Sequence, residues 1–454
     1  MGQGGYVDLI NGTPYPWTLT GQHSYQMESW SFPSTISSGQ SVPVYIEWNQ
    51  EPGKHQADDG GEAVYAIQGA SAAFQVQARN TKGFTIEVVL TSVETENNPV
   101  GSNIGLGFDH DGSVNFILGG SEGNFTSTNP SIDWMQQNMA TLGGRKLRHI
   151  CMPGSHDAGM SVFGTHTGLV KDANTLTQKF SIGEQLKAGS RWFDIRPVIS
   201  NGGFYTGHYS DTKVVGWQGA NGQSLTDIIN EINSFTEQYH ELVILDISHS
   251  LDTDNDYKEF SQSQWNNLFD QLSKINDRLN TTGISTTEDL SQRTLSQFIG
   301  HGAGSVLIVV ELPNGITLGK YFQQGIVASS PNFPFYNVYS NSDDLDTMKA
   351  DQLSKLAANR KTPDDPFFLL SWTLTETAVE SIWGSIGFPG DFNSILGMAG
   401  SAYQPLFESF GSFNAKSYPN VLYMDLFGTS EPGADSPRTD VAALAMAVNG
   451  LAKS

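Results

Sequence analysis

The pattern of hydrophobic and polar positions divides the chain into two regions. Over residues 1–120, short runs rich in Val, Ile, Tyr and Phe are separated by Gly, Asn, Pro or Asp, and several alternate apolar and polar positions. The runs are 6–13, 41–48, 62–69, 72–79, 83–93 and 113–120. A period of two is typical of strands with one buried face. Because no helical period intervenes, residues 1–120 predict an all-β sandwich domain.

The pattern changes after a Gly-, Ser- and Asn-rich stretch, and residues 121–139 are predicted to be a linker. Over residues 140–454, apolar runs alternate with helical periods. The predicted strands are 148–154, 191–199, 203–209, 241–248, 305–312, 367–374 and 420–427. The predicted helices include 176–188, 224–239, 262–275 and 344–359. The fold class predicted is α/β, a TIM-type (β/α) barrel with a separate N-terminal sandwich. A doubly wound sheet is the alternative, but no Gly-rich phosphate loop follows the first strand.

Polar residues follow nearly every predicted barrel strand. Chemistry in such barrels takes place where the carboxyl ends of the strands meet, so these side chains should surround one mouth. The set comprises His156, Asp157, Asp194, Arg196, His208, Asp246, Ser248, His249, Glu311, Ser371, Trp372 and Asp425. Each by itself is an ordinary polar residue at a strand exit. Histidines, an arginine and aspartates at the same end together favour an active site.

Composition excludes several classes of protein. The net charge is −23, with acids scattered along the 454 residues, and such a surface repels polyanions, so nucleic acid is not an expected partner. Cys151 is the only cysteine, which rules out an intramolecular disulfide and a cysteine metal cluster. No apolar run reaches the length of a membrane span. Sequons at Asn11, Asn124 and Asn280 and the scarcity of lysine favour a secreted, extracellular protein whose signal peptide is absent from this chain; an intracellular location is the alternative.

Three segments of the second region match a known pattern in order. They are "MPGSHDAGM" at 152–160, "SIGEQLKAGSRWFDIRPVI" at 181–199 and "GFYTGHYS" at 203–210. Together they resemble the X-domain of the phosphatidylinositol-specific phospholipase C superfamily, and the bacterial-type single-barrel enzymes most of all. The resemblance covers about residues 140–430. The N-terminal β-domain is not part of that bacterial pattern.

The resemblance implies a phosphodiesterase that cleaves a phospholipid headgroup ester through a cyclic phosphodiester. By position, His156 matches the general base, His208 the general acid and Arg196 the phosphate clamp. Asp425 matches the partner of His156, and Asp157 that of His208. Histidine suits both proton transfers because its pKa lies near neutrality, and a guanidinium fits phosphoryl oxygens in a fork.

Substrate contacts are predicted on the same mouth. Asp194 stands two residues before Arg196, so both side chains share one face of the strand, and Asp194 should brace Arg196 or bind a hydroxyl. The remaining expected substrate-binding residues are Ser248, Glu311, Trp372 and Tyr209. Bacterial relatives carry basic residues at the middle strand ends, so the departure here puts inositol specificity in doubt.

No cofactor is expected, because Arg196 stands where calcium-dependent relatives have a carboxylate. Calcium or magnesium held by Asp194, Asp246 and Glu311 is the alternative. Two other functions stay open: a metal-dependent glycerophosphodiesterase or sphingomyelinase D-like enzyme on the same barrel, and a binding protein with a vestigial barrel. For every one of these functions, the alternative roles of the N-terminal domain are to bind a glycan or a membrane surface and to brace the barrel.

Overall fold

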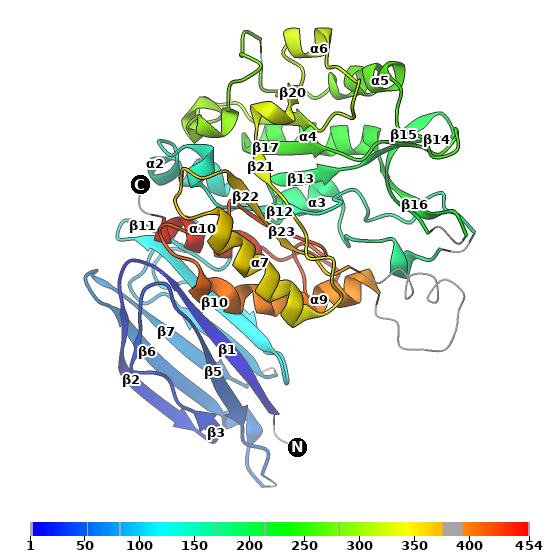
Figure 1. Ribbon diagram of the computed structural model, residues 1–454. Helices are drawn as coiled ribbons and strands as arrows, with labels where there is room; N and C mark the ends of the chain where they lie inside the picture. The colour runs from blue at the N-terminus through cyan, green and yellow to red at the C-terminus, as the bar shows by residue number, and fades with distance from the viewer. Residues whose placement is uncertain are drawn as a thin grey trace. The chain divides into compact units, whose positions relative to one another are not determined.

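A computed structural model describes residues 3–452, apart from 52, 81–82, 169, 213–214, 281 and 376–393 (Figure 1). The chain forms two compact units. One comprises Met1–Ser131, Gln404–Tyr418 and Thr439–Ser454, and the other comprises Ile132–Tyr403 and Pro419–Arg438. None of the described helices has both the length and the apolar run needed to span a bilayer.

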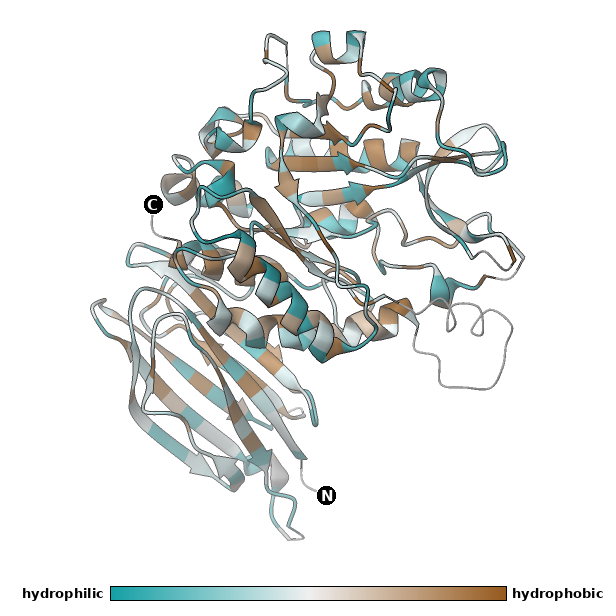
Figure 2. Ribbon diagram, in the orientation of Figure 1, coloured by the Kyte–Doolittle hydropathy of each residue, from teal (hydrophilic) through white to brown (hydrophobic). Residues whose placement is uncertain are grey.

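The first unit is a β-sandwich, as the sequence predicts. Its five-stranded sheet has the order β11 (Asn124–Ser127), β10 (Ser113–Ser121), β1 (Gln3–Gly12), β5 (Ser41–Trp48), β3 (Met27–Trp30). Its six-stranded sheet has the order β4 (Thr35–Ile36), β2 (Trp17–Tyr25), β6 (Gly60–Ile67), β7 (Ala72–Arg79), β8 (Thr85–Val89), β9 (Asn103–Gly107). Hydrophobic and hydrophilic residues alternate along these strands (Figure 2). The rings of Trp17 and Phe74 from one sheet contact Phe116 from the other, so the apolar faces of the two sheets form the core.

The sandwich unit includes residues that the sequence analysis assigned to the barrel or the linker. Strand β11 lies within the predicted linker, and helix α10 (Asp440–Leu451) packs on β10 and β1. Positions 114–119 of β10 are therefore buried on both faces, which explains why this strand is apolar without alternation. Glycine permits the close approach: a Cβ added at Gly12 would lie 2.5 Å from Ala447. The predicted barrel domain, 140–454, thus differs from the observed unit, which begins at Ile132 and lacks Gln404–Tyr418 and Thr439–Ser454.

The second unit is a (β/α) barrel, which confirms the predicted fold class. Its parallel sheet has eight described strands. They are β12 (Met152–Ser155), β13 (Trp192–Ile195), β17 (Leu242–Ile247), β19 (Ser305–Val310), β20 (Ala328–Ser329), β21 (Phe335–Tyr336), β22 (Phe367–Trp372) and β23 (Val421–Met424). Consecutive strands pair except β20 with β21, and β23 pairs with β12. Strands β12 and β23 separate β13 from β22 in the sheet. Trp192 of β13 nevertheless stacks on Phe367 of β22, with 5.5 Å between ring centres, so the sheet curls around a packed interior.

Helices alternate with these strands along the chain. The longer ones in the described part are α4 (Leu225–Tyr239), α5 (Gln262–Leu272), α7 (Leu345–Asn359) and α9 (Ile395–Glu408), and the short α3 (Ile182–Lys187) begins at Ser181. The Ser181 hydroxyl accepts from the backbone N–H of Glu184, whose carboxylate accepts from the N–H of Ser181. This reciprocal cap fixes where the helix starts.

One predicted barrel strand belongs elsewhere. Residues 203–209 lie in β15 (Gly203–Asp211), within a separate four-stranded sheet ordered β16 (Trp217–Ser224), β15, β14 (Pro197–Ser200), β18 (Leu251–Asp252). Strands β14, β15 and β16 follow each other as antiparallel hairpins, which need only short turns. The sequence did not predict two barrel strands, β20 and β21. Their pairing segments are only two residues long and give no periodic signal.

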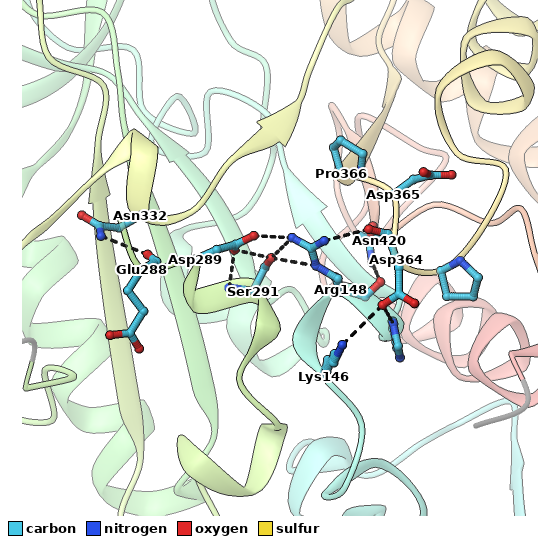
Figure 3. A network of polar contacts seen from close by, with 12 residues as sticks. Lys146, Arg148, Glu288, Asp289, Ser291, Asn332, Asp364, Asp365, Pro366 and Asn420 are labelled. Atoms are coloured by element: carbon cyan, nitrogen blue, oxygen red, sulfur yellow. Dashed lines mark hydrogen bonds and ion pairs between the residues drawn. The ribbon is translucent and has the colours of Figure 1, made fainter. Parts of the chain in front are cut away.

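A buried arginine joins several loops near the amino end of β12. The Arg148 guanidinium donates to the hydroxyl of Ser291 and the backbone carbonyl of Asp364, each at 2.8 Å, and pairs with Asp289 (Figure 3). The backbone carbonyl of Arg148 accepts from the side-chain amide of Asn420, which directly precedes β23. Arg148 therefore connects the segment before β12 to the loops that contain Asp289 and Asp364 and to the start of β23.

Replacing Arg148 by Ala should lower the free energy of unfolding by roughly 3–5 kcal/mol, because Asp289, the Ser291 hydroxyl and the Asp364 carbonyl then lose their donor. Lys146→Ala is the matched control. Lys146 is 41% exposed and lies 3.4 Å from Asp364, so its loss should cost only about 0–1 kcal/mol. Urea unfolding of both variants measures the difference; equal losses would show that the network contributes nothing beyond a surface pair.

Candidate active site

The carboxyl ends of the barrel strands surround a cavity of about 960 Å³. His156 directly follows β12, Arg196 follows β13, Glu311 follows β19 and Asp425 follows β23. These four side chains line the cavity together with His208 from β15, which reaches it from the separate four-stranded sheet. The structure therefore brings together both histidines and the arginine that the sequence motifs single out.

The hydrogen bonds of His156 define its tautomer. Its Nδ1 lies 2.6 Å from Oδ1 of Asp425, and its Nε2 lies 2.7 Å from a terminal nitrogen of Arg196. A guanidinium can only donate, so Nε2 must accept, and the proton of the neutral ring is on Nδ1, facing the carboxylate. An available lone pair at Nε2 is what a general base requires.

Opposing influences act on the protonation of His156. Burial lowers the pKa of the imidazole, but the Asp425 carboxylate raises it, and the net shift is above the ordinary value although Arg196 opposes it. The hydrogen bond from Arg196 is compatible only with an unprotonated Nε2. Protonation of this atom therefore requires the guanidinium to move away from it.

His208 has a carboxylate partner of its own. Its Nδ1 lies 2.7 Å from Oδ2 of Asp157, which is fully buried. The backbone of Asp157 is left-handed, with φ of 41°, a conformation that Asp adopts more readily than most residues. The turn lets two consecutive residues serve two histidines, because His156 bonds to Asp425 while Asp157 bonds to His208.

Arg196 is fixed by two carboxylates. Its Nε donates to Oδ2 of Asp194 at 2.9 Å, and another nitrogen lies 3.6 Å from Asp157. Burial lowers the pKa of the guanidinium, but Asp194 and Asp157 raise it above its usual value, so the charge is permanent. Asp194 thus braces Arg196, one of the two roles expected for it.

Asp194 is 3% exposed and does not line the cavity. Oδ2 accepts from Arg196, from the Tyr423 hydroxyl at 2.9 Å and from the backbone N–H of Asp157, while Oδ1 accepts from the Ser248 hydroxyl at 2.8 Å. Burial raises the pKa of this carboxyl, yet Arg196 and the other donors hold it below the ordinary value. The alternative role of Asp194 as a substrate contact is therefore not supported.

Like Asp194, three further predicted substrate-binding residues do not line the cavity. Ser248 is buried and donates to Asp194. Trp372 is 1% exposed, and its indole N–H donates to the backbone carbonyl of Ala402. The Tyr209 hydroxyl donates to Asn221, because Tyr209 and its neighbour His208 point to opposite faces of β15. Of the expected headgroup contacts, Glu311 alone lines the cavity.

Several cavity residues, Tyr423 and His249 among them, were not predicted substrate contacts. Tyr423 stands two residues before Asp425 and therefore shares its face of the chain, a signal that the sequence does contain. His249 follows β17 and lines the cavity, but a single histidine after a strand has no distinctive spacing.

Two carboxyl groups on the side of β17 and β19 have raised pKa values. Burial raises the pKa of Asp246 well above its usual value, and Glu311 and Asp194 raise it further. Burial also raises the pKa of Glu311, as does Asp194. Oδ1 of Asp246 has no hydrogen-bond partner within the described chain.

Asp425→Asn should lower the pKa of His156. The variant removes the carboxylate that favours the imidazolium, while burial and Arg196, which favour the neutral ring, remain. NMR titration of the histidine ring signals measures this pKa. Asp435→Asn, which changes an exposed carboxylate outside the cavity lining, should leave it unchanged. An unaltered or higher pKa in Asp425→Asn would contradict the assigned pairing.

Comparisons with known proteins agree with the motifs. No protein-family model matches the chain. A PI-PLC X-box domain-containing protein of Dictyostelium discoideum is 30% identical over 139 residues, which span 28% of this chain and 17% of that protein. A phosphatidylinositol-specific phospholipase C variant from Staphylococcus aureus has a TM-score of 0.47 at 17% identity, covering 71% of this chain and 97% of that one. The enzyme from Listeria monocytogenes has a TM-score of 0.44 at 16% identity, covering 70% and 98%. The sequence match confirms the predicted resemblance: this chain is similar to the phosphatidylinositol-specific phospholipase C X-domain superfamily.

Proposed function

We propose that this protein is a phosphodiesterase that cleaves the headgroup ester of a phosphatidylinositol-like phospholipid. The observation that carries the proposal is that His156, Arg196 and His208 line one cavity, and each histidine has a carboxylate on Nδ1. A phospholipid substrate also agrees with the similarity to a PI-PLC X-box domain-containing protein of Dictyostelium discoideum.

The reaction proceeds by attack of a headgroup hydroxyl on the neighbouring phosphorus. Nε2 of His156 takes the proton of this hydroxyl, whose oxygen forms a new bond to phosphorus. The bond from phosphorus to the diacylglycerol oxygen breaks, and His208 gives a proton to that oxygen. The products are a cyclic phosphodiester and diacylglycerol. Asp425 and Asp157 stabilise the imidazolium form of each histidine and fix its ring orientation.

Arg196 has two positions in this scheme. In the free protein it donates to Nε2 of His156. A bound phosphodiester offers two anionic oxygens to the guanidinium, which binds such pairs in a fork. The guanidinium then leaves Nε2, and the lone pair becomes available for the substrate hydroxyl. Binding of the phosphate and release of the base are thus coupled.

The proposed reaction needs no metal ion. A divalent cation beside Asp194 does not fit the residues present. The positively charged Arg196 guanidinium lies there, and the Asp194 carboxylate already accepts hydrogen bonds from Arg196, Ser248 and Tyr423. Calcium prefers 6–8 oxygen ligands. Among the described residues, no three side chains of His, Cys, Asp or Glu form a set that could hold a metal.

Phosphatidylinositol vesicles and ³¹P NMR in the presence of EDTA test the proposal. A cyclic phosphodiester should accumulate at the same rate with and without the chelator. Loss of activity in EDTA, restored by Ca²⁺ or Mg²⁺, would favour the metal-dependent alternative. Binding of the vesicles without any product would favour a vestigial barrel.

His156→Ala and His208→Ala should each lower kcat by about 10²–10⁴, because each removes one proton transfer. His301→Ala is the matched control, since this exposed histidine does not line the cavity and should retain full activity. Circular dichroism establishes that the variants are folded. Activity within a few-fold of the wild type in either cavity variant would contradict the assigned role.

A further inference from the structure

A third histidine in the cavity is held in one orientation. His249 follows the carboxyl end of β17 with a left-handed backbone, φ of 47°. Its Nδ1 lies 2.8 Å from the Ser248 hydroxyl oxygen. That hydroxyl gives its single proton to Asp194, so its oxygen accepts from Nδ1–H of His249. In the neutral ring, Nε2 is then a free acceptor.

The surroundings of His249 favour this neutral ring. Partial burial lowers the pKa of the imidazole, and the permanent charge of Arg196 lowers it further, while Asp194 and Asp157 oppose the shift. No hydrogen bond to Nε2 of His249 occurs within the described part of the chain. The ring therefore offers an unused lone pair on Nε2 to a ligand in the cavity.

Glu311 lies at the end of the neighbouring strand. Strand β17 pairs with β19, and the backbone N–H of Glu311 donates to the carbonyl of Ile247, two residues before His249. Glu311 and His249 both line the cavity. The cavity thus has a phosphate end with Arg196, His156 and His208, and an acceptor end with His249 and Glu311.

We propose that His249 positions the substrate by accepting a hydrogen bond at Nε2 from a hydroxyl of the headgroup, beside Glu311. This inference rests on the proposed phosphodiesterase function and adds a contact that fixes the headgroup rather than moves a proton. A polyol headgroup supplies the donors that such acceptors require. A phosphate in place of that hydroxyl supplies acceptor oxygens where a donor is required.

Headgroup analogues that each lack one hydroxyl test the contact. In the wild type, removing the hydroxyl that bonds to His249 should raise KM about tenfold with kcat nearly unchanged. His249→Ala should raise KM for the complete substrate by a similar factor, and the same analogue should then cost the variant nothing further. The His301→Ala control should respond to every analogue as the wild type does. A variant that loses kcat, or whose losses add to those of every analogue, would overturn the inference.

A second measurement separates this inference from the proposed function. Free myo-inositol, added to protein with ¹⁵N-labelled histidine, should shift the Nε2 signal of His249, and this signal is assigned by its loss in His249→Ala. A shift without phosphodiester cleavage would remove the proposed function and leave the polyol contact in place. Cleavage with no shift at saturating myo-inositol, together with additive losses, would remove the contact and leave the function.

Discussion

The carboxylate of Asp194 is the interaction on which the functional end of the barrel depends. It accepts from the backbone after β12, from Arg196 after β13, from Ser248 after β17 and from Tyr423 within β23. Four neighbouring strands are thereby joined at one buried group. Burying a carboxylate is costly unless donors replace the water it loses, and here the donors include a permanent cation. The same bonds that make the burial tolerable also fix the guanidinium at the cavity.

The adjacent histidine and aspartate at positions 156 and 157 follow from this arrangement. Along an extended strand, consecutive side chains point to opposite faces, so His156 and Asp157 could not both serve the same site. The left-handed turn at Asp157 ends the strand and brings its carboxylate beneath His208 and Arg196. Each histidine consequently obtains a separate carboxylate, and the two carboxylates come from opposite ends of the barrel sequence.

Much of this site could be predicted from the sequence, because its chemistry lies in short ordered segments. The period of two over 1–120 and the apolar runs of β17 and β19 predicted both folds. Which strand side chains face the cavity could not always be predicted. The Trp372 side chain points toward α9. Tyr209 faces away from the cavity, because β15 belongs to the separate four-stranded sheet and not to the barrel. The place of α10 was equally hidden, since its Ala-rich pattern does not say which sheet it covers.

Shared use of Asp194 gives the two ends of the cavity a fixed relation. One oxygen of this carboxylate bonds to Arg196, and the other bonds to Ser248, which orients His249. The proposed phosphate clamp and the proposed headgroup acceptor are therefore both held by the Asp194 carboxylate. Intramolecular attack is fast only when the hydroxyl and the phosphorus are held in one geometry, and small displacements of either are costly. A carboxylate that positions both partners meets this requirement without any contact to the reacting atoms.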